Sequence, residues 1–177
     1  VAESGVNQLI SLHSQESRDE EEFLMNGSGP LLSLFDQLKL DPSHIIPTGN
    51  RPLAQILSRF KKKQSLLLVH NVTTTAEDIE YLKTNRDQLP ALTFCLCPRA
   101  NLYIGNGLPD IPLLRDSGFP IVLGTDSLAS NTSLSILDEI KTIHAHFPSL
   151  PLGEIWGWAT LEGARVLQMQ DSLGSLA

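Results

Sequence analysis

The sequence predicts an α/β fold with a parallel sheet, and three observations indicate it. Short apolar runs alternate with amphipathic stretches along the chain, which is typical of repeated strand–helix units. The runs are apolar enough for strands that are covered on both faces. Each run ends abruptly in polar side chains, and four such units account for the whole chain.

Four strands are expected, each a short run rich in leucine, isoleucine or valine. They cover residues 7–13, 65–70, 91–97 and 119–126. The first two end in histidine, at His13 and His70, and the fourth ends in Asp126. The third is followed by Pro98, which has no N–H group with which to continue a sheet ladder.

Helices are expected between the strands and after the last one. Ser28 and Pro30 mark the start of one helix, and Thr75 caps another that carries negative charge in its first turn. Gly118 closes a short helix before the fourth strand. The expected helices cover residues 19–26, 29–40, 52–63, 76–85, 111–118, 134–147 and 152–168, and the last is expected to break near Gly157.

Length, composition and charge restrict the class of protein. The chain of 177 residues suffices for one domain with a core, and 41% hydrophobic with 19% charged residues is an ordinary globular balance. A formal net charge of -7 argues against a nucleic-acid partner, because phosphate contacts require a basic face. Two cysteines, no membrane-length apolar run and no signal peptide favour a cytoplasmic protein without membrane contact. The first residue is Val1 instead of methionine, which indicates a fragment.

Polar and titratable side chains follow each expected strand. They are His13 with Glu16, then His70, then the segment CPRAN (97–101), then Asp126. Because the carboxyl ends of parallel strands line the active sites of α/β proteins, these side chains are expected at one rim. Imidazole and carboxylate are ligands of Zn²⁺ and Fe²⁺, and carboxylates also transfer protons.

Each of these residues, taken singly, has a simpler structural interpretation. His13 could be a hydrogen-bonded loop histidine, and Asp126 could cap the helix that follows it. Cys95 and Cys97 point to the same side of a strand and are expected to form a buried structural pair. The other side chains that we interpret as structural or solvated are His44, His144 and His146, with Trp156 and Trp158 packing the last helix.

Four motifs in order carry a family resemblance. SLHSQES, LLLVHN, CPRANLYIGNGLPDI and IVLGTDSLASN resemble the metal-dependent amidohydrolase superfamily, in its deaminase and chlorohydrolase branch. The similarity is to the S-adenosylhomocysteine, guanine and aminodeoxyfutalosine deaminases, and WATLEGARVLQ resembles the segment that ends their barrel. The resemblance implies the C-terminal half, strands 5–8, of a (β/α)8 TIM-type barrel. Residues 1–177 would then be one partial domain that lacks strands 1–4 and a β-sandwich.

The resemblance also implies a role for each strand-end residue. His13 matches a metal ligand, and Glu16 matches the carboxyl group that carries a proton to a ring nitrogen. His70 matches the histidine that polarises the attacking water or the substrate. Asp126 matches the carboxylate that binds one divalent metal, zinc or iron, and takes a proton from water.

The segment CPRANLYIGNG is expected to shape the pocket for a small-molecule substrate, with Arg99 and Asn101 as its polar candidates. Ala100 stands where many members of the family have serine. The family also carries a His-x-His pair after strand 1, and no such pair precedes His13. The sequence HAH at 144–146 lies on an expected helix after the last strand.

The implied function is removal of ammonia from a purine-like ring by attack of a metal-activated water. Two alternatives stay open, namely a hydrolase with chloride or another leaving group, and an inactive fragment or binding module. Half a barrel would leave two open, apolar strand edges. We therefore expect either a homo-oligomer or pairing with the missing half.

Overall fold

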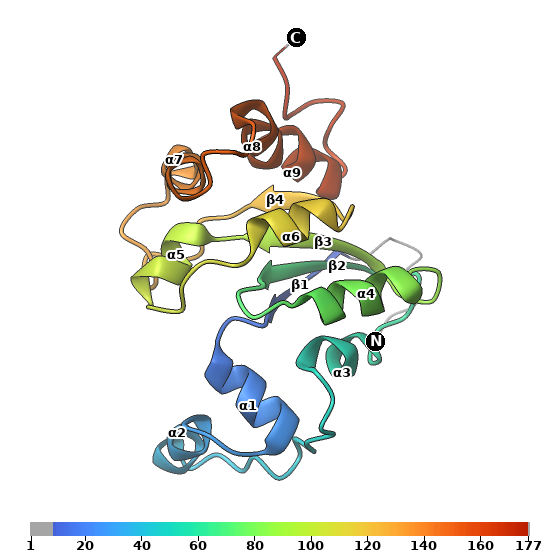
Figure 1. Cartoon of the computed structure of the whole chain (residues 1–177), viewed down its shortest axis with the longest axis vertical. Coiled ribbons are helices and arrows are strands. Elements are labelled where there is room, and N and C mark those ends of the chain that lie inside the picture. The colour runs from blue at the N-terminus through green and yellow to red at the C-terminus, as the bar shows by residue number, and fades with distance from the viewer. Residues whose placement is uncertain (1–8, 177) are drawn as a thin grey trace.

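A computed structural model describes residues 9–176, which contain a four-stranded parallel sheet (Figure 1). The strands pair in chain order, β1-β2-β3-β4. Their bounds are β1 (Leu9–Ser14), β2 (Ser65–His70), β3 (Ala91–Leu96) and β4 (Ile121–Leu123). The predicted α/β class and parallel sheet are confirmed, while residues 7 and 8 of the first expected strand lie outside the described residues.

Helices connect the strands and follow the last one. Three of them, α1 (Arg18–Asn26), α2 (Leu31–Leu38) and α3 (Pro52–Leu57), lie between β1 and β2 in the chain. The others are α4 (Ala76–Thr84), α5 (Pro98–Tyr103), α6 (Ile111–Asp116), α7 (Ile136–His146), α8 (Leu152–Ala159) and α9 (Leu161–Val166). In Figure 1, α1 and α2 extend below the β1 side of the sheet and α7, α8 and α9 lie above its β4 side. Among the described residues, no helix has the length and apolarity needed to cross a bilayer.

The two faces of the sheet carry different side chains, because successive residues of a strand point to opposite faces. One row across the sheet contains Leu12, Leu68, Phe94 and Ile121. This row belongs to the main core, with apolar side chains of α3, α4, α6, α7 and α8. The next row contains His13, Val69, Cys95 and Val122. The face with His13 is therefore the one that is opposite the main core.

The helix expected at residues 52–63 is shorter than the sequence predicted. It ends at Leu57, and the three lysines at 61–63 lie exposed in a turn. The side-chain oxygen of Gln64 accepts the N–H of Lys61 at 2.7 Å. This hydrogen bond stabilises the turn in place of a further helical turn.

Four other expectations need correction. The break in the last helix lies at Thr160 instead of Gly157, because the φ and ψ of Thr160 are −131° and −86° and its hydroxyl donates to the carbonyl of Trp156 at 2.8 Å. Trp158 is buried as expected, but Trp156 is exposed. Residues 98–101 form the first part of α5 instead of a turn, since proline at the first position favours a helix. The fourth strand is limited to three residues between Pro120 and Gly124.

A second, smaller core cluster makes Gly124 sensitive to substitution. It consists of Val69, Cys95, Cys97, Ala100 and Val122. A Cβ atom at Gly124 would lie 3.0 Å from the Cys95 sulfur and 3.2 Å from the Cys97 sulfur, and both cysteines are buried. We expect Gly124→Ala to lower the free energy of unfolding by about 1–3 kcal/mol, the usual cost of overpacking. Denaturant unfolding of the full-length protein measures it.

Gly153→Ala provides the matched control, because Gly153 lies in α8 and a Cβ atom there meets nothing within 4 Å. That variant is expected to gain up to about 1 kcal/mol from helix propensity. Cys95→Ala should relieve most of the Gly124→Ala penalty. Equal stability of Gly124→Ala and the wild type would contradict this account of the packing.

Candidate functional site

Four of the residues singled out in the sequence meet at the carboxyl end of the sheet. The Nε2 atom of His70 lies 3.6 Å from Oε1 of Glu16 and 4.0 Å from Oδ2 of Asp126. The rings of His13 and His70 have their centroids 5.0 Å apart. Residues from β1, from β2 and from the segment after β4 therefore converge on one point.

His70 is directed to this point by an unusual backbone conformation. In β2, His70 comes two residues after Leu68 and four after Leu66, which both face the main core. Regular alternation would therefore direct its side chain to that same face. However, the φ angle of His70 is 77°, in the left-handed region, and its ring lies beside His13. The side chain of His70 is only 1% exposed.

Asn101 contacts the other nitrogen of this imidazole. The Nδ1 atom of His70 lies 2.8 Å from Oδ1 of Asn101, and Asn101 is fully buried at the end of the first turn of α5. This contact fixes the orientation of the ring, so that Nε2 faces the carboxylates of Glu16 and Asp126. The substrate-binding role of Asn101 stays a prediction, and the structure adds this contact with His70.

Glu16 is positioned by the residues on either side of it. Its backbone N–H donates to Oε2 of Glu20 at 2.8 Å, in the first turn of α1. The hydroxyl of Ser17 caps this helix by accepting from the N–H of Glu20 at 3.1 Å. On the other side, Gln15 is fully buried, and the N–H of Thr73 donates to its carbonyl at 3.0 Å. The connection after β1 is therefore bonded to the connection after β2.

A buried ion pair lies behind Gln15. Asp78, with its side chain 3% exposed, accepts hydrogen bonds at 2.8 Å from Nε of Arg51 and at 3.0 Å from Nε2 of Gln15. Arg51 also pairs with Glu21 of α1 and donates to the carbonyl of Thr73 at 2.9 Å. Burial raises the pKa of Asp78, but the hydrogen bonds and the charge of Arg51 outweigh burial and lower the pKa below its usual value.

Asp126 follows β4 by three residues and also has a left-handed backbone, with φ of 57°. Its carboxylate accepts from the N–H of Ser127 at 2.8 Å and from the hydroxyl of Ser130 at 2.6 Å. Burial raises the pKa of Asp126. The two hydrogen bonds from Ser127 and Ser130, together with the charges of the nearby His70 and His13 rings, lower this pKa by more. The pKa of Asp126 therefore lies below its usual value, which favours the ionised form.

Arg99 lies apart from this group. Its guanidinium donates to Oδ1 of Asn131 at 3.4 Å and to the hydroxyl of Thr132 at 2.5 Å. Its backbone N–H donates to the fully buried carboxylate of Glu139 at 2.9 Å, and burial raises the pKa of Glu139. In the described residues the Arg99 side chain thus braces the loop after Asp126, and its role toward a substrate stays a prediction.

Several residues around the site have no signal in the sequence. Gln15 and Arg51 lie 36 positions apart in the chain, and only the fold places both against Asp78. The amide of Asn131 donates to the carbonyl of Thr125 at 2.8 Å and so holds the segment before Asp126. The left-handed conformation of Gln15 could not be anticipated, because glycine or asparagine are its usual markers.

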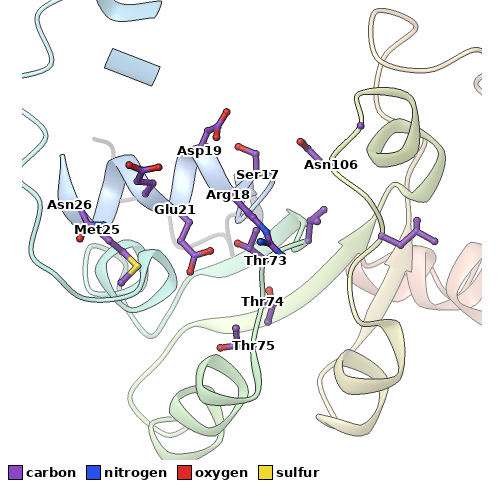
Figure 2. Close-up of a pocket in the computed structure, with 14 residues that line it drawn as sticks. Ser17, Arg18, Asp19, Glu21, Met25, Asn26, Thr73, Thr74, Thr75 and Asn106 are labelled. Atoms are coloured by element: carbon purple, nitrogen blue, oxygen red, sulfur yellow. The ribbon is translucent and has the colours of Figure 1, made fainter. Parts of the chain in front are cut away.

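A cavity of about 820 Å³ borders the residues that hold Glu16. Figure 2 shows its walls, with side chains of α1 on one side and the three threonines at 73–75 on another. Ser17 and Arg18 belong to the first wall, and Asn106 comes from the segment between α5 and α6. The lining of this cavity includes none of His13, Glu16, His70 and Asp126.

The site residues fit a divalent metal ion in donor type but not in number. An imidazole from His13 and a carboxylate from Asp126 are suitable donors for zinc or iron. A catalytic zinc site takes three protein ligands, and within residues 9–176 no three His, Cys, Asp or Glu side chains are arranged to hold a metal. His13 and Asp126 could therefore supply only part of a coordination shell.

Comparisons with known proteins identify the family of the chain. The amidohydrolase family profile matches residues 44–177. A 5-methylthioadenosine/S-adenosylhomocysteine deaminase of Teredinibacter turnerae is 34% identical over 116 residues, which are 61% of this chain and 25% of that protein. The chain thus spans about a quarter of the length of this relative.

Two solved structures share the fold. The aminofutalosine deaminase of Helicobacter pylori, in complex with methylthio-coformycin, has a TM-score of 0.73 and 28% identity over 90% of this chain and 38% of that one. An adenosine deaminase from Xanthomonas campestris with bound zinc has a TM-score of 0.62 and 24% identity, covering 93% of this chain and 34% of that one. The second likeness, at its lower identity, concerns the fold alone.

The Arg51–Asp78 pair gives a testable consequence for stability. Arg51→Met would leave the Asp78 carboxylate buried without its cation, at a cost on the order of 3 kcal/mol of unfolding free energy at pH 7. Because the pKa of Asp78 is lowered by folding, its contribution is present above the unfolded pKa of about 4 and is lost as the pH falls below it. Unfolding of the full-length protein between pH 3 and 7 measures both effects.

The double variant Arg51→Met with Asp78→Asn serves as the control. Removing the charge of Asp78 should restore most of the stability that Arg51→Met loses. A penalty that is the same at pH 7 and at about pH 3 would show that Arg51 does not act through the ionised carboxylate.

Proposed function

Since the chain belongs to the amidohydrolase family, we propose that it carries part of the active site of a metal-dependent hydrolase for C–N bonds other than peptide bonds. The reaction that we propose is removal of ammonia from a purine-like ring. One observation carries the proposal: the carboxylates of Glu16 and Asp126 both lie near His70 Nε2, at 3.6 and 4.0 Å. Two carboxyl groups and an imidazole around one point can move the protons of such a hydrolysis.

The environment of each carboxylate suits a different role. Asp126 is held ionised by Ser127 and Ser130, so it is available as a base that takes a proton from water. Within the described part of the chain, the Glu16 side chain makes no hydrogen bond and only approaches His70, and this side chain is 31% exposed. It is therefore free to carry a proton to a ring nitrogen of a substrate. His70 Nε2, near both carboxylates, would orient the water or the ring.

We propose that His13 and Asp126 help to hold one divalent ion, zinc or iron, with the remaining ligands outside the described residues. When bound, such an ion lowers the pKa of water toward neutrality and so makes it a better nucleophile. The adenosine deaminase from Xanthomonas campestris, with its bound zinc and shared fold, supports this proposal. We also propose that Arg99 and Asn101, two polar residues of α5, contribute to substrate binding.

The place of this chain in a larger architecture is also a proposal. We assign β1 to β4 to strands 5–8 of a (β/α)8 barrel, with residues 1–177 as one partial domain. β1 and β4 are the outer strands of the sheet, and within the described residues neither pairs with a further strand. Further strands of a barrel, or a second copy of this chain, would cover these edges.

The two free thiols, Cys95 and Cys97, support a cytoplasmic location.

The proposal is tested by ammonia release from the full-length protein with a panel of aminopurines and their nucleosides. Glu16→Gln should lower kcat by about 100-fold or more, because a positioned acid contributes about 10²–10⁴. Glu77→Gln makes the same chemical change on an exposed residue of α4 and should leave kcat unchanged. Release of chloride from chlorinated rings without release of ammonia would favour the other leaving group. Full activity of Glu16→Gln would remove Glu16 from the mechanism.

A further inference from the structure

Gln15 combines three features that are rarely found together. It is fully buried, although it is a long polar residue. Its φ angle is 53°, a left-handed conformation that is unfavourable for an L-residue with a side chain. It also lies directly before Glu16 in the chain. A buried polar side chain on a strained backbone requires surrounding contacts that fix it in place.

The hydrogen bonds of the Gln15 amide determine its orientation. Its Nε2 donates to Oδ2 of Asp78 at 3.0 Å, and its Oε1 accepts from the hydroxyl of Thr74 at 2.7 Å. A carboxylate only accepts hydrogen bonds, so the amide nitrogen must face Asp78 and the amide oxygen must face Thr74. Both partners are themselves buried, at 4% and 7% exposure.

The partners of Gln15 belong to the segment that follows His70. Thr74 lies four residues after His70, and Asp78 forms a capping box with Thr75 at the start of α4. The backbone reinforces this link, because the N–H of Thr73 donates to the carbonyl of Gln15 and the N–H of Asn71 to the carbonyl of Ser14, both at 3.0 Å. Side chain and backbone of Gln15 thus join the segment of Glu16 to the segment of His70.

We propose that Gln15 is a positioning residue that sets the distance between the Glu16 carboxylate and His70 Nε2. It acts through its amide, which holds the chain after β1 against the Asp78–Arg51 pair. The proposal for the geometry stands on the contacts alone, and its consequence for kcat rests on the function proposed above. Proton transfer depends steeply on distance, so a displaced Glu16 would lower kcat and change KM much less.

Thr74→Val tests the link without a large cavity, since it removes only the hydroxyl that donates to Gln15. Thr93→Val is the matched control, because Thr93 is a buried threonine of β3 that lies outside the site. Gln15→Leu is the stronger variant, and it removes both amide hydrogen bonds while it keeps a similar volume. Circular dichroism and thermal unfolding of each full-length variant establish that it folds.

The primary measurement is the crystal structure of each full-length variant that folds. We expect the Glu16 carboxylate to move away from His70 Nε2 by more than about 1 Å in Thr74→Val and Gln15→Leu and to stay in place in Thr93→Val. An unmoved Glu16 in both variants would overturn the proposal whether or not the protein has the activity proposed above.

The second measurement is kcat, read as a double-mutant cycle. We expect Gln15→Leu to lower kcat about 10-fold or more when residue 16 is glutamate, and to have almost no further effect in the Glu16→Gln variant. Equal fold-losses in the two backgrounds would mean that Gln15 does not act through Glu16. Glu16 could move in the variants while the wild type releases no ammonia from any substrate. That combination would uphold the positioning role of Gln15 and reject the proposed reaction.

Discussion

The parallel register that pairs Ser14 with His70 is the constraint on which the rest of this site depends. In a parallel sheet, the carboxyl ends of all strands lie at one edge, and this register brings the residues after β1 level with the residues after β2. Main-chain hydrogen bonds continue across the two connections beyond the strands, from Asn71 to Ser14 and from Thr73 to Gln15. A slip of one residue would turn His13 to the opposite face and separate it from His70.

The strand ends are also where the backbone departs most from ordinary geometry. Gln15, His70, Asn71 and Asp126 all have φ angles between 53° and 77°, and none of them is glycine. Such conformations persist only where the surroundings determine them. Here the surroundings are buried polar contacts: Asp78 and Thr74 hold Gln15, Asn101 holds His70, and Ser127 and Ser130 hold Asp126. The buried polar contacts and the strained backbone therefore occur at the same residues, and among the two carboxylates it is Asp126 whose side chain is fixed by hydrogen bonds.

The general plan of the molecule is readable in the sequence because it depends on local patterns. Apolar runs indicated the positions of the four strands, and Thr75 was correctly predicted to cap the start of α4. His13, Glu16, His70 and Asp126 could be grouped in advance, since strand ends share an edge whatever the helices do. The end of α3 and the helical form of residues 98–101 were missed, because they depend on the turn in which Gln64 binds the N–H of Lys61 and on the fit of Pro98 at a helix start.

The sequence could not reveal the surrounding residues that hold those side chains in place. Arg51 reaches Asp78 and Glu21 only through the three-dimensional path of α1 to α3. Arg99 and Asn101 stand two positions apart, yet Asn101 is buried against His70 while the Arg99 side chain turns to Asn131 and Thr132. No local pattern distinguishes these two directions, because the helical turn of α5 sends neighbouring side chains to different surroundings.

The central claim is that the residues at 13, 16, 70 and 126 form one centre around a divalent ion. The most direct test is anomalous diffraction at the zinc and iron absorption edges from crystals of the full-length protein grown with each metal. The account predicts one strong peak within coordination distance of both His13 and Asp126, with the Glu16 carboxyl group close to it and not among its ligands. A metal bound elsewhere, or a peak that touches neither His13 nor Asp126, would contradict it.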